Sequence, residues 1–180
     1  EALEREHSLK DLRVDIQTLR DFPRALREGD WQVTVSVWND QEISRIRPGR
    51  HEDAFGMAID VGTTTIAAYL CNLRTMEVVD TVSMMNPQCK YGEDVMARIT
   101  YHMTTSDGLK RMGDDIIEGL NTLVDQAVAN TYPPTKKRKD EDGNKVEVEE
   151  PEEGKTYYRL SREDIEEITL GGNTAMHHIL

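Results

Sequence analysis

Hydrophobic residues recur at helical spacing near the start of the chain. Leu9, Leu12, Ile16 and Leu19 lie three or four positions apart, and charged residues separate them. Such spacing places the four side chains on one face, which predicts an amphipathic helix over residues 9–26.

The pattern then changes from helical spacing to strict alternation. Pro23 predicts a break or kink in the first helix, with a second short helix over residues 24–28. Residues 31–38 alternate between apolar and polar side chains, which is typical of a half-buried strand. Residues 39–40 predict a turn, and residues 42–47 predict the return strand.

A second pattern begins at residue 55. The almost continuous apolar run over residues 55–61 predicts a strand buried on both faces. Two further strands are expected over residues 65–73 and 77–85. Because only short turns separate these three strands, they are expected to be antiparallel neighbours.

Helical stretches and a fourth strand follow. Residues 92–103 and 109–128 show helical spacing of apolar residues, residues 168–170 predict a short strand, and a helix is expected from Thr174. A strand reached through a helical crossover is expected to be parallel to the first strand. The predicted fold class is therefore α/β and ribonuclease H-like, with three antiparallel strands followed by helix, strand and helix.

The chain is expected to contain two domains. Residues 1–54 form a small α+β unit, and residues 55–180 form the ribonuclease H-like subdomain. Residues 135–155 are rich in charge and almost free of large apolar side chains, so they predict a flexible charged insertion. Val146 and Val148 still allow a short exposed hairpin there.

Composition excludes several classes of function. The 180 residues have a net charge of −12, which disfavours nucleic-acid binding and an anionic membrane surface. No apolar run approaches the roughly 20 residues that span a bilayer. Cys71 and Cys89 are the only cysteines, so a reducing, cytoplasmic setting is expected. They cannot supply the four thiolates of an ordinary iron–sulfur cluster.

The candidate chemistry lies between the first two predicted strands. Asp60 ends an apolar run, and Gly62, Thr63, Thr64 and Thr65 follow it. A carboxylate there suits Mg²⁺, and a glycine with hydroxyls suits the close approach of phosphate groups. The alternative is an ordinary hairpin in which the threonines only favour strand structure.

Three segments together resemble one protein family. These are residues 58–70 (AIDVGTTTIAAYL), residues 86–101 (NPQCKYGEDVMARITY) and residues 171–180 (GGNTAMHHIL). The first segment resembles the phosphate motif of the acetate and sugar kinase, Hsp70 and actin superfamily. In this order, the three are similar to reductive activators of corrinoid proteins, which are ATP-dependent ferredoxin-like proteins. Residues 1–54 would correspond to the family's linker domain.

The resemblance implies ATP and Mg²⁺ in the complete protein, with Asp60 as the catalytic carboxylate that holds Mg²⁺ directly or through water. The implied cofactor-binding residues are Gly62, Thr63, Thr64, Thr65, Gly172, Asn173 and Thr174. For the last three, a plain turn with a helix N-cap is an equally good interpretation. The resemblance also implies a [2Fe–2S] cluster on a domain absent from this chain, and a second phosphate motif that the chain lacks. The chain is therefore expected to supply half of a nucleotide site.

The function implied is the return of Co(II) corrinoid proteins to Co(I) at the expense of ATP. The implied partner is a corrinoid protein or a corrinoid-dependent methyltransferase, and a homodimer is a further expected assembly. Two alternatives remain open at this point. One is a sugar- or acetate-kinase-like phosphotransferase subdomain, and the other is a non-catalytic interaction module of the same fold.

Overall fold

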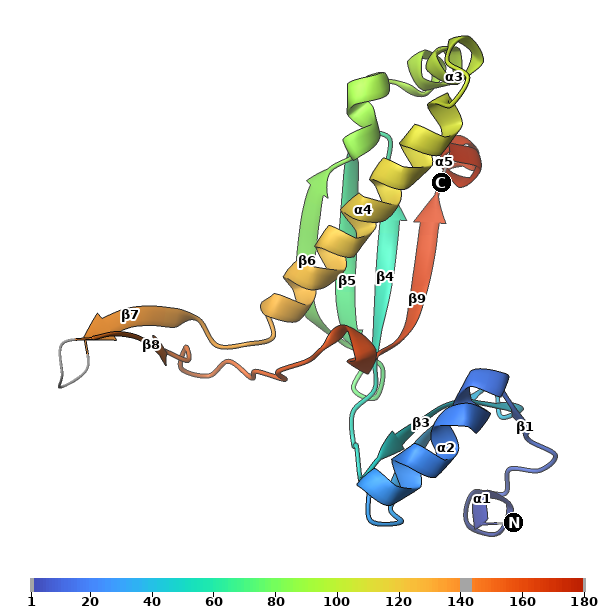
Figure 1. Ribbon diagram of the computed structural model, residues 1–180, viewed down its shortest axis with the longest axis vertical. Helices are drawn as coiled ribbons and strands as arrows, with labels where there is room; N and C mark the ends of the chain where they lie inside the picture. Colours follow the sequence, from blue (N-terminus) through green and yellow to red (C-terminus); the bar gives the residue numbers. More distant parts are fainter. Residues whose placement is uncertain (1, 140–143, 180) are drawn as a thin grey trace. The chain divides into compact units, whose positions relative to one another are not determined.

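The computed structural model describes residues 2–139 and 144–179 (Figure 1). The chain divides into two units, Glu1–Ala54 and Phe55–Leu180. Each unit has sheets of its own. Among the helices described, none is both long and apolar enough to cross a bilayer.

The first unit is a small sheet with a helix packed on it. Its elements are α1 (Ala2–His7), β1 (Arg13–Val14), α2 (Ile16–Glu28), β2 (Val33–Trp38) and β3 (Glu42–Pro48). The strand order is β1-β3-β2, with β2 antiparallel and β1 parallel to β3. The predicted hairpin at residues 31–47 is confirmed, although its first strand begins at Val33.

The first helix begins later than the apolar spacing predicts. Asp15 is its N-cap, and the Asp15 carboxylate accepts hydrogen bonds from the Gln17 and Thr18 N–H groups at 2.8 and 3.2 Å. Leu9 and Leu12 precede the helix, so the prediction of one helix from residue 9 is wrong. The reason is tertiary, because β1 pairs with β3 immediately before the cap and keeps the chain extended.

The helix also packs through a different face from the predicted one. Leu19 is 59% exposed, whereas Thr18 and Ala25 are buried. The Thr18 hydroxyl donates to the Ser44 carbonyl at 2.6 Å and fixes α2 on β3. Pro23 lies inside α2 and does not end it. Pro23 lies on the exposed side of α2. Proline has no N–H to donate to the carbonyl one helical turn earlier, and water can donate to that carbonyl instead.

The second unit contains eleven elements among its described residues. They are β4 (Phe55–Val61), β5 (Thr65–Asn72), β6 (Glu77–Met85), the 3₁₀ helix η1 (Pro87–Tyr91), α3 (Val95–Thr104), α4 (Gly108–Ala129), β7 (Thr135–Lys139), β8 (Lys145–Glu149), the 3₁₀ helix η2 (Arg162–Asp164), β9 (Ile165–Gly172) and α5 (Thr174–Ile179).

The main sheet of this unit has the order β6-β5-β4-β9. Strands β4, β5 and β6 are antiparallel neighbours, and β9 is parallel to β4 (Figure 1). This arrangement confirms the predicted α/β fold class and its strand order. The last strand is longer than the residues 168–170 expected from the sequence, because the pairing with β4 extends from Ile165 to Gly172.

The core lies between this sheet and α4. Figure 1 shows α4 crossing one face of the sheet, and its buried side chains pack against the inward-facing residues of β4 and β5. The fully buried members of this core are Ile66, Ala68, Leu70, Met112, Ile116 and Leu123. Because α4 packs on one face of the sheet, it determines which side chains of the strands are buried.

The opposite face of the sheet is open within the described residues. Along β4, Met57, Ile59 and Val61 are buried, whereas Ala58 and Asp60 are exposed. The prediction that this strand is buried on both faces is therefore wrong. The apolar run did not reveal that the two faces of β4 differ, because alanine is small enough to lie on either face. The alanine concealed the alternation of buried and exposed residues.

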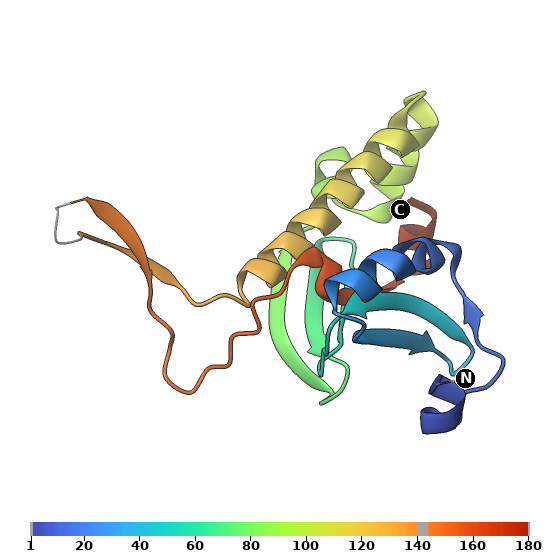
Figure 2. The ribbon, with the colours of Figure 1, turned by 60° about the horizontal axis from the view of Figure 1, so that its bottom comes forward.

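Strands β7 and β8 form a separate two-stranded sheet (Figure 2). Lys136 and Glu150 form an ion pair at 2.5 Å, and Lys137 lies 4.0 Å from Glu147. The charged insertion thus contains the hairpin that its two valines allowed. Residues 140–143, also part of the predicted insertion, lie outside the described residues.

Candidate functional site

The two groups of predicted site residues meet at one edge of the main sheet. In the parallel pairing of β4 and β9, Asp60 lies opposite Gly171 and Val61 lies opposite Gly172. The carboxyl ends of two parallel strands point to the same edge. The turn after Asp60 and the turn after Gly172 are therefore neighbours, although about 110 residues separate them in the sequence.

The turn between β4 and β5 requires glycine. The Gly62 N–H donates to the Thr65 carbonyl at 3.0 Å. A Cβ atom on residue 62 would lie 2.6 Å from that carbonyl oxygen, which is too close for any side chain. Thr64 and Thr65 are exposed and Thr63 is half-buried, so hydroxyl groups surround a tight backbone turn.

Asp60 differs in one respect from its prediction. It lies near the end of β4 as expected, but on the open face of the sheet, where it is exposed. Burial therefore does not force a cation onto this carboxylate. Within the described residues, no cluster of three or more His, Cys, Asp or Glu side chains could hold a metal ion.

Asn86 supports the turn from the loop after β6. It is fully buried, its N–H donates to the Thr64 carbonyl at 2.8 Å, and its Nδ2 donates to the Gly62 carbonyl at 2.8 Å. Its Oδ1 accepts the Gln88 N–H at 2.9 Å and begins η1. The second motif of the sequence therefore contacts the first one directly.

Arg98 contacts the same turn, and the sequence reasoning missed it. Its side chain is fully buried. Its Nη2 donates to the Thr63 carbonyl, and its Nε donates to the Gly92 carbonyl at 3.0 Å. The only signal in the sequence was a single arginine inside a helix that is otherwise mostly apolar, and surface helices often contain one.

The turn after β9 is held by a helix cap. Asn173 Oδ1 accepts the Met176 N–H at 3.1 Å, which is the contact of an N-cap residue. A Cβ on Gly172 would lie 3.1 Å from the Val61 carbonyl oxygen, so this residue brings the two strands close together. Thr174 is exposed at the start of α5. The N-cap interpretation of Asn173 thus has a geometric basis.

Both units of the chain match regions of one known protein family. A family described as the RACo linker region matches residues 1–53, and one described as the RACo middle region matches residues 55–138. Together they cover most of the chain. The chain belongs to the RACo family. The RACo middle region begins at Phe55, where β4 begins, and its match ends before Gly172 and Asn173.

Two relatives of this RACo chain are named for corrinoid activation. A corrinoid activation enzyme, RamQ from Eubacterium limosum, is 29% identical over 124 residues, which are 68% of this chain and 21% of RamQ. A solved structure of a reductive activator for corrinoid, iron-sulfur protein is 25% identical, with a TM-score of 0.68. That match covers 99% of this chain and 24% of the solved one. The chain thus spans between a fifth and a quarter of each relative.

A charged cluster joins η1 to α4 in the RACo middle region. Asp115 accepts hydrogen bonds from Lys90 Nζ at 2.8 Å and from the Tyr91 hydroxyl. The Lys90 ammonium, followed by the Tyr91 hydroxyl, lowers the pKa of the Asp115 carboxyl below its ordinary value. The carboxylate in turn raises the pKa of Tyr91. The cluster fixes the segment that contains Asn86 on the core helix.

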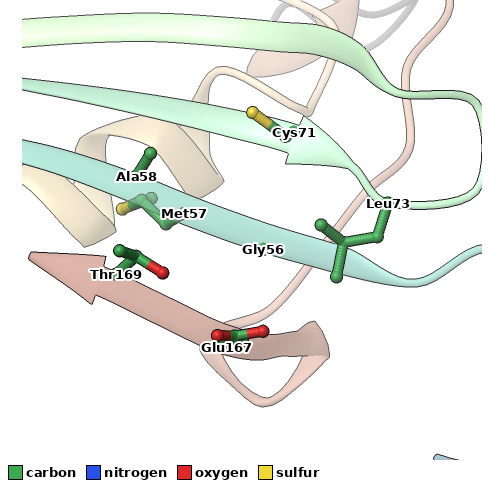
Figure 3. Close-up of a pocket in the computed structure, with 7 residues that line it drawn as sticks. All are labelled: Gly56, Met57, Ala58, Cys71, Leu73, Glu167 and Thr169. Carbon is green, nitrogen blue, oxygen red and sulfur yellow. The ribbon is translucent and has the colours of Figure 1, made fainter. Parts of the chain in front are cut away.

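The second unit of this RACo chain also has a small pocket at the opposite end of its main sheet. Figure 3 shows Gly56 and Leu73 on one side of the pocket and Glu167 and Thr169 on the other. Its volume is about 110 Å³, whereas ligand pockets usually exceed roughly 300 Å³. It lies at the start of β4, away from Asp60, so it is not part of the candidate site.

Proposed function

We propose that the complete protein is an ATP-dependent reductive activator that returns Co(II) corrinoid proteins to Co(I). In this proposal, the present chain supplies one side of the Mg·ATP phosphate site. The supporting observation is the pairing that places Asp60 and the Gly62 turn beside Gly172. Family membership and the names of the two relatives agree with this activity.

The residues at this edge fit a phosphate group and Mg²⁺. Gly62 keeps the turn tight, because a Cβ there would lie 2.6 Å from the Thr65 carbonyl oxygen. The hydroxyls of Thr63, Thr64 and Thr65 provide hydrogen-bond donors. The exposed Asp60 carboxylate suits Mg²⁺, which usually keeps several water ligands. Bound Mg²⁺ would neutralise phosphate charge and favour hydrolysis.

The site in this chain is half of a nucleotide site in our proposal. Its residues line one edge of an open sheet face, so another part of the complete protein must cover the nucleotide. The [2Fe–2S] cluster that delivers the electron belongs to another domain, because Cys71 and Cys89 are the only thiols here. The isolated chain should accordingly bind ATP weakly.

The proposed partner is a corrinoid protein or a corrinoid-dependent methyltransferase, encountered in the cytoplasm. Reduction to Co(I) is uphill, so ATP turnover must change how the activator binds its partner in the two states. We include a homodimer of the complete protein in the proposal. The net charge of −12 also agrees with a protein partner in preference to nucleic acid.

The test uses the complete protein with a reductant, Mg·ATP and a Co(II) corrinoid protein, with Co(I) formation followed by absorption. The wild type should form Co(I) only with ATP, and the Asp60→Asn variant should lose most of this rate. Asp114→Asn is the matched control, because Asp114 is an exposed carboxylate on α4 that pairs with Lys110 on the same helix.

Other outcomes would favour other functions. Transfer of phosphate from ATP to a small alcohol or carboxylate would identify a phosphotransferase. Partner binding without any nucleotide binding, measured by calorimetry, would identify a non-catalytic interaction module. Failure to form Co(I) with every corrinoid partner tried, despite Mg·ATP binding, would reject the redox part of the proposal alone.

A further inference from the structure

Arg98 is a buried cation directly behind the proposed phosphate turn. It lies in α3, and its exposed fraction is 0%. Burial of a charged group is costly unless other groups compensate for lost water. Long charged side chains are rarely buried completely, so the complete burial of this arginine requires an explanation.

The hydrogen bonds of Arg98 all end within the protein. Nη2 contacts the Thr63 carbonyl and lies 3.4 Å from the sulfur of Cys89. Nη1 lies 3.4 Å from Gln88 Oε1 and 3.7 Å from the sulfur of Met176, and Nε donates to the Gly92 carbonyl. The guanidinium therefore cannot turn outward to bind a ligand directly without losing these contacts.

None of these five partners is a carboxylate. They are two carbonyl oxygens, one amide oxygen and two sulfur atoms. The partners satisfy the donors of Arg98, and among the residues that the structure describes none of them brings a bonded counter-charge. In a medium of low dielectric, such a charge favours an anion nearby more strongly than it would in water.

The partners also connect the whole candidate site. Thr63 belongs to the turn after β4, Gln88 and Cys89 to η1, and Met176 to α5. One side chain thus links the three sequence motifs. A planar guanidinium suits this role because its five N–H donors have a fixed geometry.

We propose that Arg98 is a positioning residue for the phosphate groups of the nucleotide. It holds the Thr63 carbonyl and so fixes the turn, and its buried charge complements the phosphates without touching them. This inference rests on the proposed nucleotide site, but it assigns the favourable electrostatics of that site to a buried side chain behind the turn.

The test measures binding of Mg·ATP, Mg·ADP and adenosine to the complete protein by calorimetry. Arg98→Met should weaken Mg·ATP binding by about 10- to 100-fold, the effect of losing a charged hydrogen-bonding group. Mg·ADP should lose less affinity, and adenosine should lose little. Arg98→Lys should fall between, since it keeps the charge and loses the fork. Arg111→Met is the control, because Arg111 is exposed on α4.

A second pair of variants tests the same inference even if the Arg98 variants do not fold. Gln88→Glu places a carboxylate beside the guanidinium, whereas Gln88→Met is neutral. Both lose the hydrogen bond from Gln88 Nε2 to the Met112 carbonyl. Gln88→Glu should bind Mg·ATP several-fold more weakly than Gln88→Met, while both should bind adenosine equally.

Several results would overturn the inference. Equal Mg·ATP affinity of the two Gln88 variants would do so, as would an Arg98→Met loss that is the same for adenosine as for Mg·ATP. The experiments distinguish failure of the two proposals. Wild-type protein that does not bind Mg·ATP rejects both of them. Wild-type binding that is weakened by Asp60→Asn but unaffected by the Arg98 variants rejects only the role of Arg98.

Discussion

Asp60 lies opposite Gly171 in the parallel pairing of β4 and β9. The two strands end together, and the turns that follow them share one edge of the sheet. The proposed phosphate site depends on this pairing, because neither turn supplies a site alone.

Gly62→Ala should damage both stability and nucleotide binding. The added Cβ would lie 2.6 Å from the Thr65 carbonyl oxygen, so the turn must shift. We expect a loss of about 1–3 kcal/mol in the free energy of unfolding, measured by urea denaturation. Gly171→Ala is the control, since its nearest neighbouring atom would be 3.9 Å away. Equal effects of the two substitutions would contradict the steric explanation.

Asn86→Ala should destabilise the second unit by about 2–4 kcal/mol. Two side-chain hydrogen bonds are lost, and buried polar groups of Gly62 and Gln88 are left without their partner. Asn130→Ala removes a single exposed bond to Asp80 and should cost less than about 1 kcal/mol. Comparable losses in the two variants would show that Asn86 does not hold the turn.

The Asp115 cluster should make stability depend on pH in the acidic range. Because folding lowers the pKa of this carboxyl, its contribution is present above its ordinary pKa of about 4. The contribution is lost as the pH falls through the lower, folded-state value. Asp115→Asn should therefore reduce stability at pH 7 and have little effect at the acidic end of the transition.

The measurement for this prediction is urea unfolding across the acidic pH range. Asp114→Asn serves as the neighbouring control, because the Asp114 side chain is 64% exposed and pairs only with Lys110 one turn away. If the stability difference between wild type and Asp115→Asn stays constant with pH, the cluster does not act through the charge of this carboxylate.

Substitutions at Asn173 should separate its two interpretations. Asn173→Ala removes the cap of α5 and should cost about 1 kcal/mol of stability. Asn173→Asp keeps an acceptor for the Met176 N–H but adds a negative charge. If this residue also faces the phosphates, Asn173→Asp should bind Mg·ATP more weakly than Asn173→Ala. Matching affinities would leave Asn173 with the capping role only.

The strand order could be predicted because local signals determined it. Short turns at residues 62–64 and 73–76 force antiparallel neighbours, and a long helix such as α4 carries the chain across to a parallel strand. The site edge followed from the same logic, since Asp60 lies next to the last residue of β4 and Gly172 ends β9. These signals lie within a few residues of the features that they determine.

The sequence predictions were wrong or incomplete where residues distant in the sequence determine the structure. Leu9 and Leu12 show helical spacing, but β1 pairs with β3 nearby in space and prevents a helix there. Arg98 could not be recognised because its burial depends on η1 and α5, which meet only in the folded unit. The exposure of Asp60 likewise reflects which face α4 covers, and the small alanine at position 58 concealed the alternation along β4.

The parallel pairing of β4 with β9 has a consequence for how the protein folds. Strands β4, β5 and β6 can pair as soon as they have been synthesised, whereas Asp60 must wait for Gly171, about 110 residues later. Closing so long a loop costs conformational entropy. Helices that form between β4 and β9 shorten the flexible part of this loop and lower that cost. The phosphate edge therefore cannot form before residue 171 has been synthesised, and it depends on the whole stretch of chain between the two strands.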